Sequence, residues 1–115
     1  MSDIQTHEND FDFERYYHAH MFWSDATFGP HNRTKGILEH LTKEIEEVRE
    51  SPNDASEWAD LIILAIDGAW RNGLNAQDII KALLEKQKKN SERKWPDWRT
   101  RSADEAIEHI RLGEE

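Results

Sequence analysis

The sequence predicts an all-α protein, a compact bundle of helices. Three stretches repeat apolar residues at the spacing of a helix, and no stretch alternates with a period of two over a useful length. Short turns separate these stretches, which favours antiparallel helices as neighbours. We therefore expect helices packed on helices, and no sheet.

The amino-terminal part divides into a polar tail and an aromatic stretch. Residues 1–12 are polar and show no periodicity, so we expect a flexible tail followed by a single helical domain over residues 13–115. The stretch FERYYHAHMFWSDATF predicts one short helix that ends at a Gly-Pro turn. Aromatic side chains are more often core than base-stacking groups, so we expect at least two of Phe22, Trp23 and Phe28 to be buried.

A helix is predicted from Thr34 to about Glu50, because its apolar residues fall on one stripe. These residues are Ile37, Leu38, Leu41, Ile45 and Val48. The run Ser-Pro-Asn-Asp that follows breaks the helix, and either Asp54 or Ser56 is suited to cap the next one.

The next predicted helix, from about Ser56 to Asn72, is apolar on most sides. Its apolar residues are Trp58, Leu61, Ile62, Ile63, Leu64, Ile66, Ala69 and Trp70. A helix of this kind is usually buried from several directions. Gly73 stands at a position where helices commonly end.

Asn75 and Asp78 have the spacing of a reciprocal helix cap, and they predict a further helix that runs to about Arg93. A last short helix is expected over about Asp104 to Arg111. These two helices complete the predicted bundle.

The composition limits the classes of function. The net charge of −9 argues against a general binder of nucleic-acid polymers, because clustered Lys and Arg hold phosphate backbones. The chain has no cysteine, and no apolar stretch approaches the ~20 residues of a membrane span. We expect a cytoplasmic protein. Only 37% of the residues are hydrophobic and 34% are charged, so burial between subunits would help stability and we expect a homo-oligomer.

Several common catalytic motifs are absent from the sequence. No glycine-rich phosphate loop, dinucleotide-binding glycine pattern or Gly-x-Ser-x-Gly elbow is present. No Glu is followed three residues later by His, which removes the motif of ferritin-like di-iron bundles.

Acidic residues interrupt the core-facing stripe of the helix that begins at Thr34. Glu44 falls on the same arc as the apolar residues, and Glu47 projects from its edge beside His40. Glu46 points to the opposite side and is expected to face solvent. An isolated Glu-x-x-Glu is also typical of a solvated helix face in a chain with 24 acidic residues.

A second acidic group lies on the most apolar helix. Glu57, Asp60 and Asp67 share one side of it with Arg71. Buried like charges repel and lose hydration, so they need a metal ion, a cationic partner or a proton. One solution is Mg²⁺ held between the two helices, with Glu44, Glu47, Glu57 and Asp60 as ligands. For Asp67, an ion pair with Arg71 is as well supported as metal binding. His40 is expected to pack beside the ligands, because Mg²⁺ prefers oxygen.

The helix that follows Asn75 turns cationic toward its carboxyl end. Lys86, Asn90 and Arg93 share one side, and Lys94 extends the same region as a candidate phosphate-binding surface. The alternative is a solvated end that complements the helix dipole. Arg33, beside the Gly-Pro turn, is a further candidate for contact with a triphosphate.

The pairs Glu44/Glu47 and Glu57/Asp60 resemble the signature of the all-α nucleoside-triphosphate pyrophosphohydrolases, the MazG-like superfamily. A longer pattern through FGPHNRTKGILEHLTKEIEEV, EWADLIILAIDGAWRNG and KQKKNSERKWPDWR is similar to the phage-associated dATP/dGTP diphosphohydrolases, of which the MazZ proteins are members.

This resemblance implies hydrolysis of dATP and dGTP to monophosphate and pyrophosphate. We expect the oligomer to be a homodimer or homotetramer, and a phage-encoded chain to act in the host cytoplasm. The resemblance also implies that the four carboxylates hold Mg²⁺ or Mn²⁺ and that Glu44 or Glu47 takes the proton of the attacking water. Lys86, Asn90, Arg93 and Lys94 would neutralise the phosphates. In phages that replace adenine by 2-aminoadenine, the reaction would supply dGMP and deplete dATP.

Two other functions fit the same sequence. One is an acidic helical interaction protein in which the Glu pairs form surface salt bridges. The other is a nucleotide-binding regulator that kept the fold without turnover. The acidic pair on the most apolar helix favours the enzyme over the first of these, because an adaptor has no need to place carboxylates there.

Overall fold

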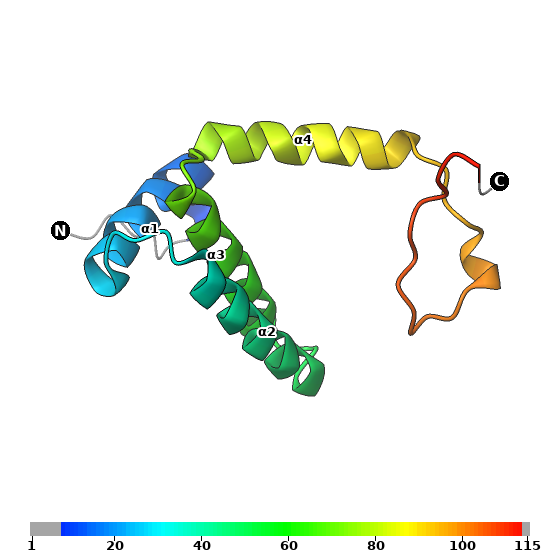
Figure 1. The fold of residues 1–115 in the computed structure, drawn as a ribbon, viewed down its shortest axis with the longest axis horizontal. Helices are drawn as coiled ribbons and strands as arrows, with labels where there is room; N and C mark the ends of the chain where they lie inside the picture. The colour runs from blue at the N-terminus through cyan, green and yellow to red at the C-terminus, as the bar shows by residue number, and fades with distance from the viewer. Residues whose placement is uncertain (1–7, 114–115) are drawn as a thin grey trace. The chain divides into compact units, whose positions relative to one another are not determined.

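The computed structural model describes residues 8–113, and every regular element within that range is helical. The elements in chain order are η1 (Glu8–Asp10), α1 (Phe13–Phe28), α2 (Thr34–Glu50), α3 (Ala55–Arg71), α4 (Ala76–Glu92) and η2 (Trp98–Thr100), which Figure 1 colours along the chain. The all-α fold class is thereby confirmed. The predicted tail over residues 1–12 falls largely outside the described residues, and it stays a prediction together with the single domain.

The observed helices follow the predicted boundaries closely from Thr34 onward. α2 begins and ends at the predicted residues, Thr34 and Glu50, and α3 and α4 differ from their predicted ends by about one residue. The aromatic stretch forms a helix of 16 residues, α1, which is longer than the short helix expected. The side chain of Asp12 caps it by accepting from the backbone N–H of Arg15 at 2.9 Å.

Local caps define the ends of α3 and α4. Asp54 accepts from the backbone N–H of Ser56 at 2.9 Å, which identifies Asp54 as the cap of α3. Gly73, with φ of 86°, ends α3 in the left-handed conformation that glycine tolerates. Asn75 and Asp78 exchange side-chain to backbone bonds of 2.8 Å each, as the sequence predicted.

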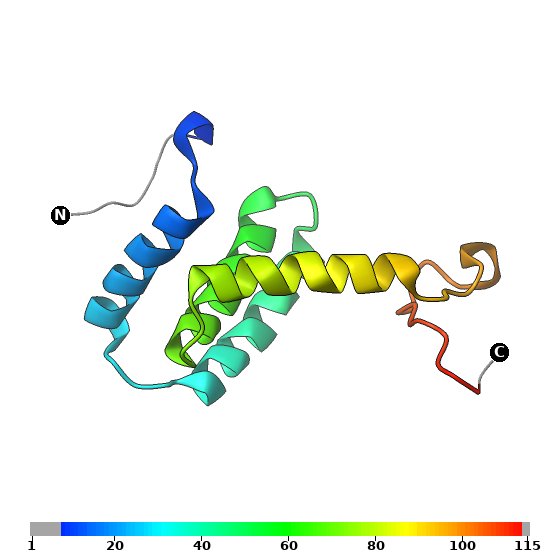
Figure 2. The same ribbon diagram turned by 90° about the horizontal axis from the view of Figure 1, so that it is seen from above.

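Within the described residues, the chain up to Ile79 forms one compact unit. α2 and α3 lie side by side as a hairpin, and α1 packs against α3 (Figures 1 and 2). The core of this unit centres on Tyr17, Ile66 and Ala76. Tyr17 is fully buried, and its hydroxyl donates to the carbonyl of Leu74 at 2.6 Å, so the phenol is both packed and satisfied.

The chain from Ile80 onward forms a second compact unit, with most of α4 followed by η2. The helix expected over Asp104 to Arg111 is absent from the described residues. The backbone N–H of Ile110 instead donates to the carbonyl of Lys94 at 2.7 Å, and His109 packs edge-on against Trp95. A contact with a distant segment therefore replaces the local hydrogen bonds of a helix.

The expectation that α3 is buried from several directions is wrong for the single chain. Trp58 is 51% exposed and Ile62 is 61% exposed, although Ile66 on the same helix is buried. Two neighbouring helices cover only part of a helix surface, so a broad apolar stripe extends past the contact. In the described part of the chain, no helix is long and apolar enough to cross a membrane.

Candidate functional site

Three carboxylates from two helices meet at one point of the first unit. Glu44 comes from the middle of α2, and Glu57 and Asp60 come from the first turns of α3. One oxygen atom of each lies within 4.8 Å of the others. Glu57 and Asp60 share a helix face because they are three residues apart. Their oxygen donors suit a hard divalent cation such as Mg²⁺.

The charge balance at this cluster is unfavourable without a cation. Desolvation raises the pKa of Glu57, and the negative charges of Glu47, Asp54, Asp60 and Glu44 raise it further. Among the described residues near the cluster, acidic groups thus dominate the electrostatics at Glu57. The donor set and the raised pKa both fit a site for a divalent cation.

The remaining predicted residues of α2 lie as follows. The carboxylate of Glu47 is exposed and is not one of the three clustered groups, although its charge acts on Glu57. His40 lies 3.2 Å from Glu44, measured from Nε2 to the carboxylate oxygen, as expected for a residue that packs beside the cluster. Glu46 points away and pairs with Arg49 at 3.0 Å, as the helical geometry predicted.

A pocket of about 190 Å³ begins at the carboxylates and runs between α1, α2 and α3. Glu44 and Asp60 form part of its lining, and Trp23, Phe28 and Arg33 form another part. The rings of Trp23 and Phe28 meet edge-to-face with centroids 5.6 Å apart. The Arg33 guanidinium carbon lies 5.5 Å from the centroid of Phe28.

These positions correct the expectation that at least two of the three aromatic residues are core. Phe22, Trp23 and Phe28 are 73%, 42% and 48% exposed. The core of the unit is built around Tyr17, Ile66 and Ala76, whereas Trp23 and Phe28 line the pocket.

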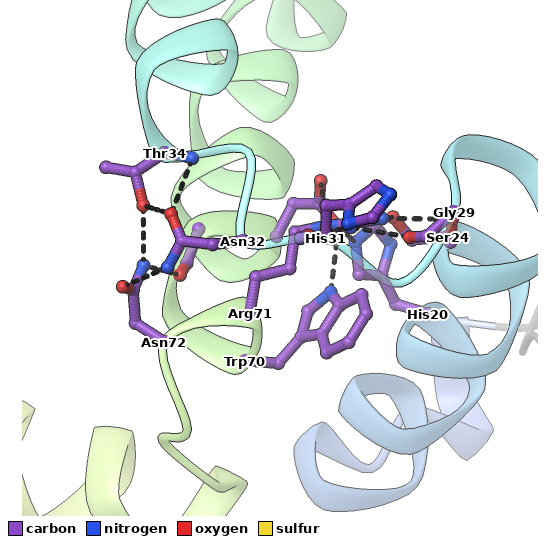
Figure 3. A network of polar contacts seen from close by, with 11 residues as sticks. His20, Ser24, Gly29, His31, Asn32, Thr34, Trp70, Arg71 and Asn72 are labelled. Atoms are coloured by element: carbon purple, nitrogen blue, oxygen red, sulfur yellow. Dashed lines mark hydrogen bonds and ion pairs between the residues drawn. The ribbon is translucent and has the colours of Figure 1, made fainter.

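A buried polar network closes another part of the pocket. Asp67 accepts hydrogen bonds from His20 at 3.0 Å, Ser24 at 2.5 Å and Trp70 at 2.8 Å. Figure 3 shows His20, Ser24 and Trp70 close to Arg71. Burial by itself would raise the pKa of Asp67, but these hydrogen bonds and the charge of Arg71 more than offset that effect and hold the pKa below its usual value.

Asp67 is therefore an ionised residue whose charge the protein itself neutralises. It pairs with Arg71 at 3.3 Å, which confirms the ion-pair alternative. Sequence reasoning missed His20 and Ser24 as its partners, because they lie 47 and 43 residues away along the chain and no spacing links them.

The four predicted phosphate-binding residues beyond Ile80 belong to the second unit. Lys86 is exposed on α4, and Arg93 donates to the side-chain oxygen of Asn90 at 3.0 Å. Lys94 follows the helix. The role of these four residues in phosphate binding stays a prediction.

Known proteins similar to this chain point to one family. A family model described as dATP/dGTP pyrophosphohydrolase matches residues 16–112. The Eaa protein of Salmonella phage P22 is 40% identical over 84 residues, which make up 73% of this chain and 26% of the phage protein. The chain thus spans about a quarter of the length of that relative. No solved structure matches the chain.

Replacement of Glu57 by Gln tests the cluster directly. Because the pKa of Glu57 is raised in the folded protein, folding favours the protonated carboxyl. The stability that this carboxyl contributes is full below its ordinary pKa of 4.5, and it is lost as the pH rises through the raised pKa. We therefore expect Glu57→Gln to increase the thermal stability of the metal-free protein at neutral pH. Added Mn²⁺ should stabilise the wild type by about 2.7 kcal/mol at a concentration about 100-fold above Kd, and the variant far less.

Glu46→Gln is the matched control, because it removes one charge from the same helix as Glu44 outside the cluster. Thermal melts with and without the cation supply the measurement. Equal stabilisation of wild type and Glu57→Gln by Mn²⁺ would rule out the cluster as the cation site.

Proposed function

The chain belongs to the dATP/dGTP pyrophosphohydrolase family, and from that membership we propose that it converts purine deoxynucleoside triphosphates to monophosphates and pyrophosphate. One observation carries the proposal most directly. Carboxylates of two neighbouring helices converge beside an aromatic-lined pocket, an arrangement that would suit a cation and a nucleotide base within one unit.

The proposed metal ligands are Glu44, Glu57 and Asp60, with Glu47 as a fourth carboxylate at their edge. A bound Mg²⁺ or Mn²⁺ would place positive charge against the phosphate oxygens and make a nearby water more acidic. The three clustered carboxylates would hold it from two helices, so that its position is set by the rigid hairpin of α2 and α3.

The proposed reaction is attack by water on the α-phosphorus. The new bond joins the water oxygen to that phosphorus, and the bond from the phosphorus to the α,β-bridging oxygen breaks, releasing pyrophosphate. The water proton passes to a carboxylate, for which Glu47 and Glu44 are the candidates. Glu47 is the more accessible of the two, since its side chain is exposed.

The purine would lie against Trp23 and Phe28, which line the pocket that the carboxylates border. Arg33 lines the same pocket and would contact the phosphates or the base edge. Lys86, Arg93 and Lys94 are proposed to neutralise the charge of the phosphates, and Asn90 to donate a hydrogen bond to them. In a phage that uses 2-aminoadenine, the activity would supply dGMP and remove dATP.

Turnover of each deoxynucleoside and ribonucleoside triphosphate with Mg²⁺ tests the activity, scored as monophosphate and pyrophosphate. In heavy-oxygen water the label should enter the monophosphate, because attack is at the α-phosphorus. Glu57→Gln and Asp60→Asn should each lower kcat by about 100-fold or more while the helical circular dichroism persists. Glu46→Gln should keep full activity.

If the wild type hydrolyses none of the nucleotides, the proposed enzymatic activity is ruled out. Binding of nucleotides without hydrolysis would indicate a nucleotide-binding regulator. Label found only in pyrophosphate would contradict the proposed site of attack.

The base pocket is tested by shortening its aromatic side chains. Trp23→Ala and Phe28→Ala should each raise KM for purine substrates by about tenfold, since stacking of a base on an aromatic ring contributes about 1–3 kcal/mol. Phe22→Ala is the control from the same helix, because Phe22 is 73% exposed and is not part of the pocket lining. An equal rise of KM in the Phe22 variant would argue against this base site.

We also propose that the chain assembles as a homodimer or homotetramer through its exposed apolar residues. Trp58 and Ile62 on α3 are each more than half exposed, and Leu38 on α2 is 55% exposed. Light scattering should give a mass at a multiple of 13.6 kDa, and Ile62→Glu should reduce it to the single-chain value. A wild type that scatters as a single chain would disprove the assembly.

A further inference from the structure

The guanidinium of Arg71, at the end of α3, uses all five of its N–H donors inside the protein (Figure 3). Its Nε donates to Asp67 at 3.3 Å. One terminal nitrogen donates to the carbonyls of Gly29 and His31, each at 2.7 Å. The other donates to the carbonyl and the hydroxyl of Ser24, at 3.0 and 2.9 Å. The side chain is fully buried.

The acceptors of Arg71 connect α3 to the end of α1 and to the loop over residues 29–33. This loop has no regular secondary structure, and it includes Gly29 with φ of 89° and Arg33 with φ of 56°. A left-handed conformation at a residue such as arginine persists only where the surroundings hold it. Since the carbonyls of Gly29 and His31 are bound by one rigid cation, Arg71 sets the path of the first part of the loop.

Asn72 holds the second part of the same loop (Figure 3). Its side-chain oxygen accepts from Asn32 at 2.7 Å, and its nitrogen donates to the hydroxyl of Thr34 at 3.0 Å. Arg71, the last residue of α3, and Asn72, the residue that follows it, therefore attach the whole loop. Arg71 does so from a buried position and Asn72 from an exposed one.

The loop is bounded by two residues of the candidate pocket. Phe28 immediately precedes it, and Arg33 ends it with its guanidinium above the ring of Phe28. Arg71 is not among the lining residues, so it acts on the pocket through its neighbours, which are the loop and Asp67, itself a lining residue.

We propose that Arg71 is a positioning residue for nucleotide binding, which rests on the proposed function of the pocket. Through the carbonyls of Ser24, Gly29 and His31 it holds Phe28 and Arg33 where the base and phosphates would contact them. Asp67 orients the guanidinium and neutralises its charge. A lysine at this position keeps the ion pair but presents its donors from a single nitrogen, which cannot reach both sides of the loop.

The test is Arg71→Lys, alone and combined with Phe28→Ala and Arg33→Gln. In an otherwise wild-type chain, Arg71→Lys should raise KM for dGTP by about tenfold and change kcat less than about twofold. The Kd for dGTP, measured by calorimetry with Ca²⁺, should rise by about tenfold as well. In the chain that already lacks the Phe28 and Arg33 side chains, the same change should have almost no further effect, because the groups it positions are gone.

Tyr17→Phe is the matched control. It removes a buried hydrogen bond to Leu74 in the core, away from the pocket lining, and should lower the melting temperature without changing KM or Kd. An unchanged KM and Kd in Arg71→Lys, or an equal rise in both backgrounds, would overturn the proposal and leave Arg71 a stabilising residue only. Absence of turnover in the wild type would refute the proposed enzyme, and the Kd values would still decide the role of Arg71 in binding.

Discussion

The ion pair between Asp67 and Arg71 is the interaction on which the arrangement of α1, α2 and α3 depends. Two buried charges are stable only where partners replace the water they lose. Here the partners are the side chains of His20 and Ser24 on α1, Trp70 on α3, and the loop carbonyls that lead to α2. The pair therefore attaches α1 and the start of α2 to the end of α3.

α3 carries carboxylates at both of its ends, in opposite electrostatic surroundings. At its carboxyl end, hydrogen-bond donors and a guanidinium surround Asp67 and lower its pKa. At its amino end, desolvation and other carboxylates raise the pKa of Glu57. The protein itself neutralises the charge of Asp67, whereas the carboxylates around Glu57 are left with excess negative charge that a cation would neutralise. The pocket lies between these two ends, since both Asp60 and Asp67 line it.

Local patterns predicted most of the helices. The apolar stripe from Ile37 to Val48 lies within α2, and the reciprocal cap of Asn75 and Asp78 starts α4. Both signals depend on residues within a few turns of one helix. Prediction failed where distant contacts compete with local ones. The segment before Arg111 pairs with Lys94 instead of forming a helix, and the exposed side of α1 carries aromatic residues that the sequence placed in a core.

For the candidate site, the sequence by itself determined which carboxylates share a helix face. That followed from the three-residue spacing of Glu57 and Asp60 and from the place of Glu44 on the apolar arc, while Glu46 was set apart on the opposite side. Only the tertiary structure decided that the carboxylate of Glu44 lies beside those of Glu57 and Asp60, and that Glu47 stays outside this cluster. It alone gave Asp67 its partners, because helix packing brings together residues more than 40 positions apart and no periodicity encodes such pairs.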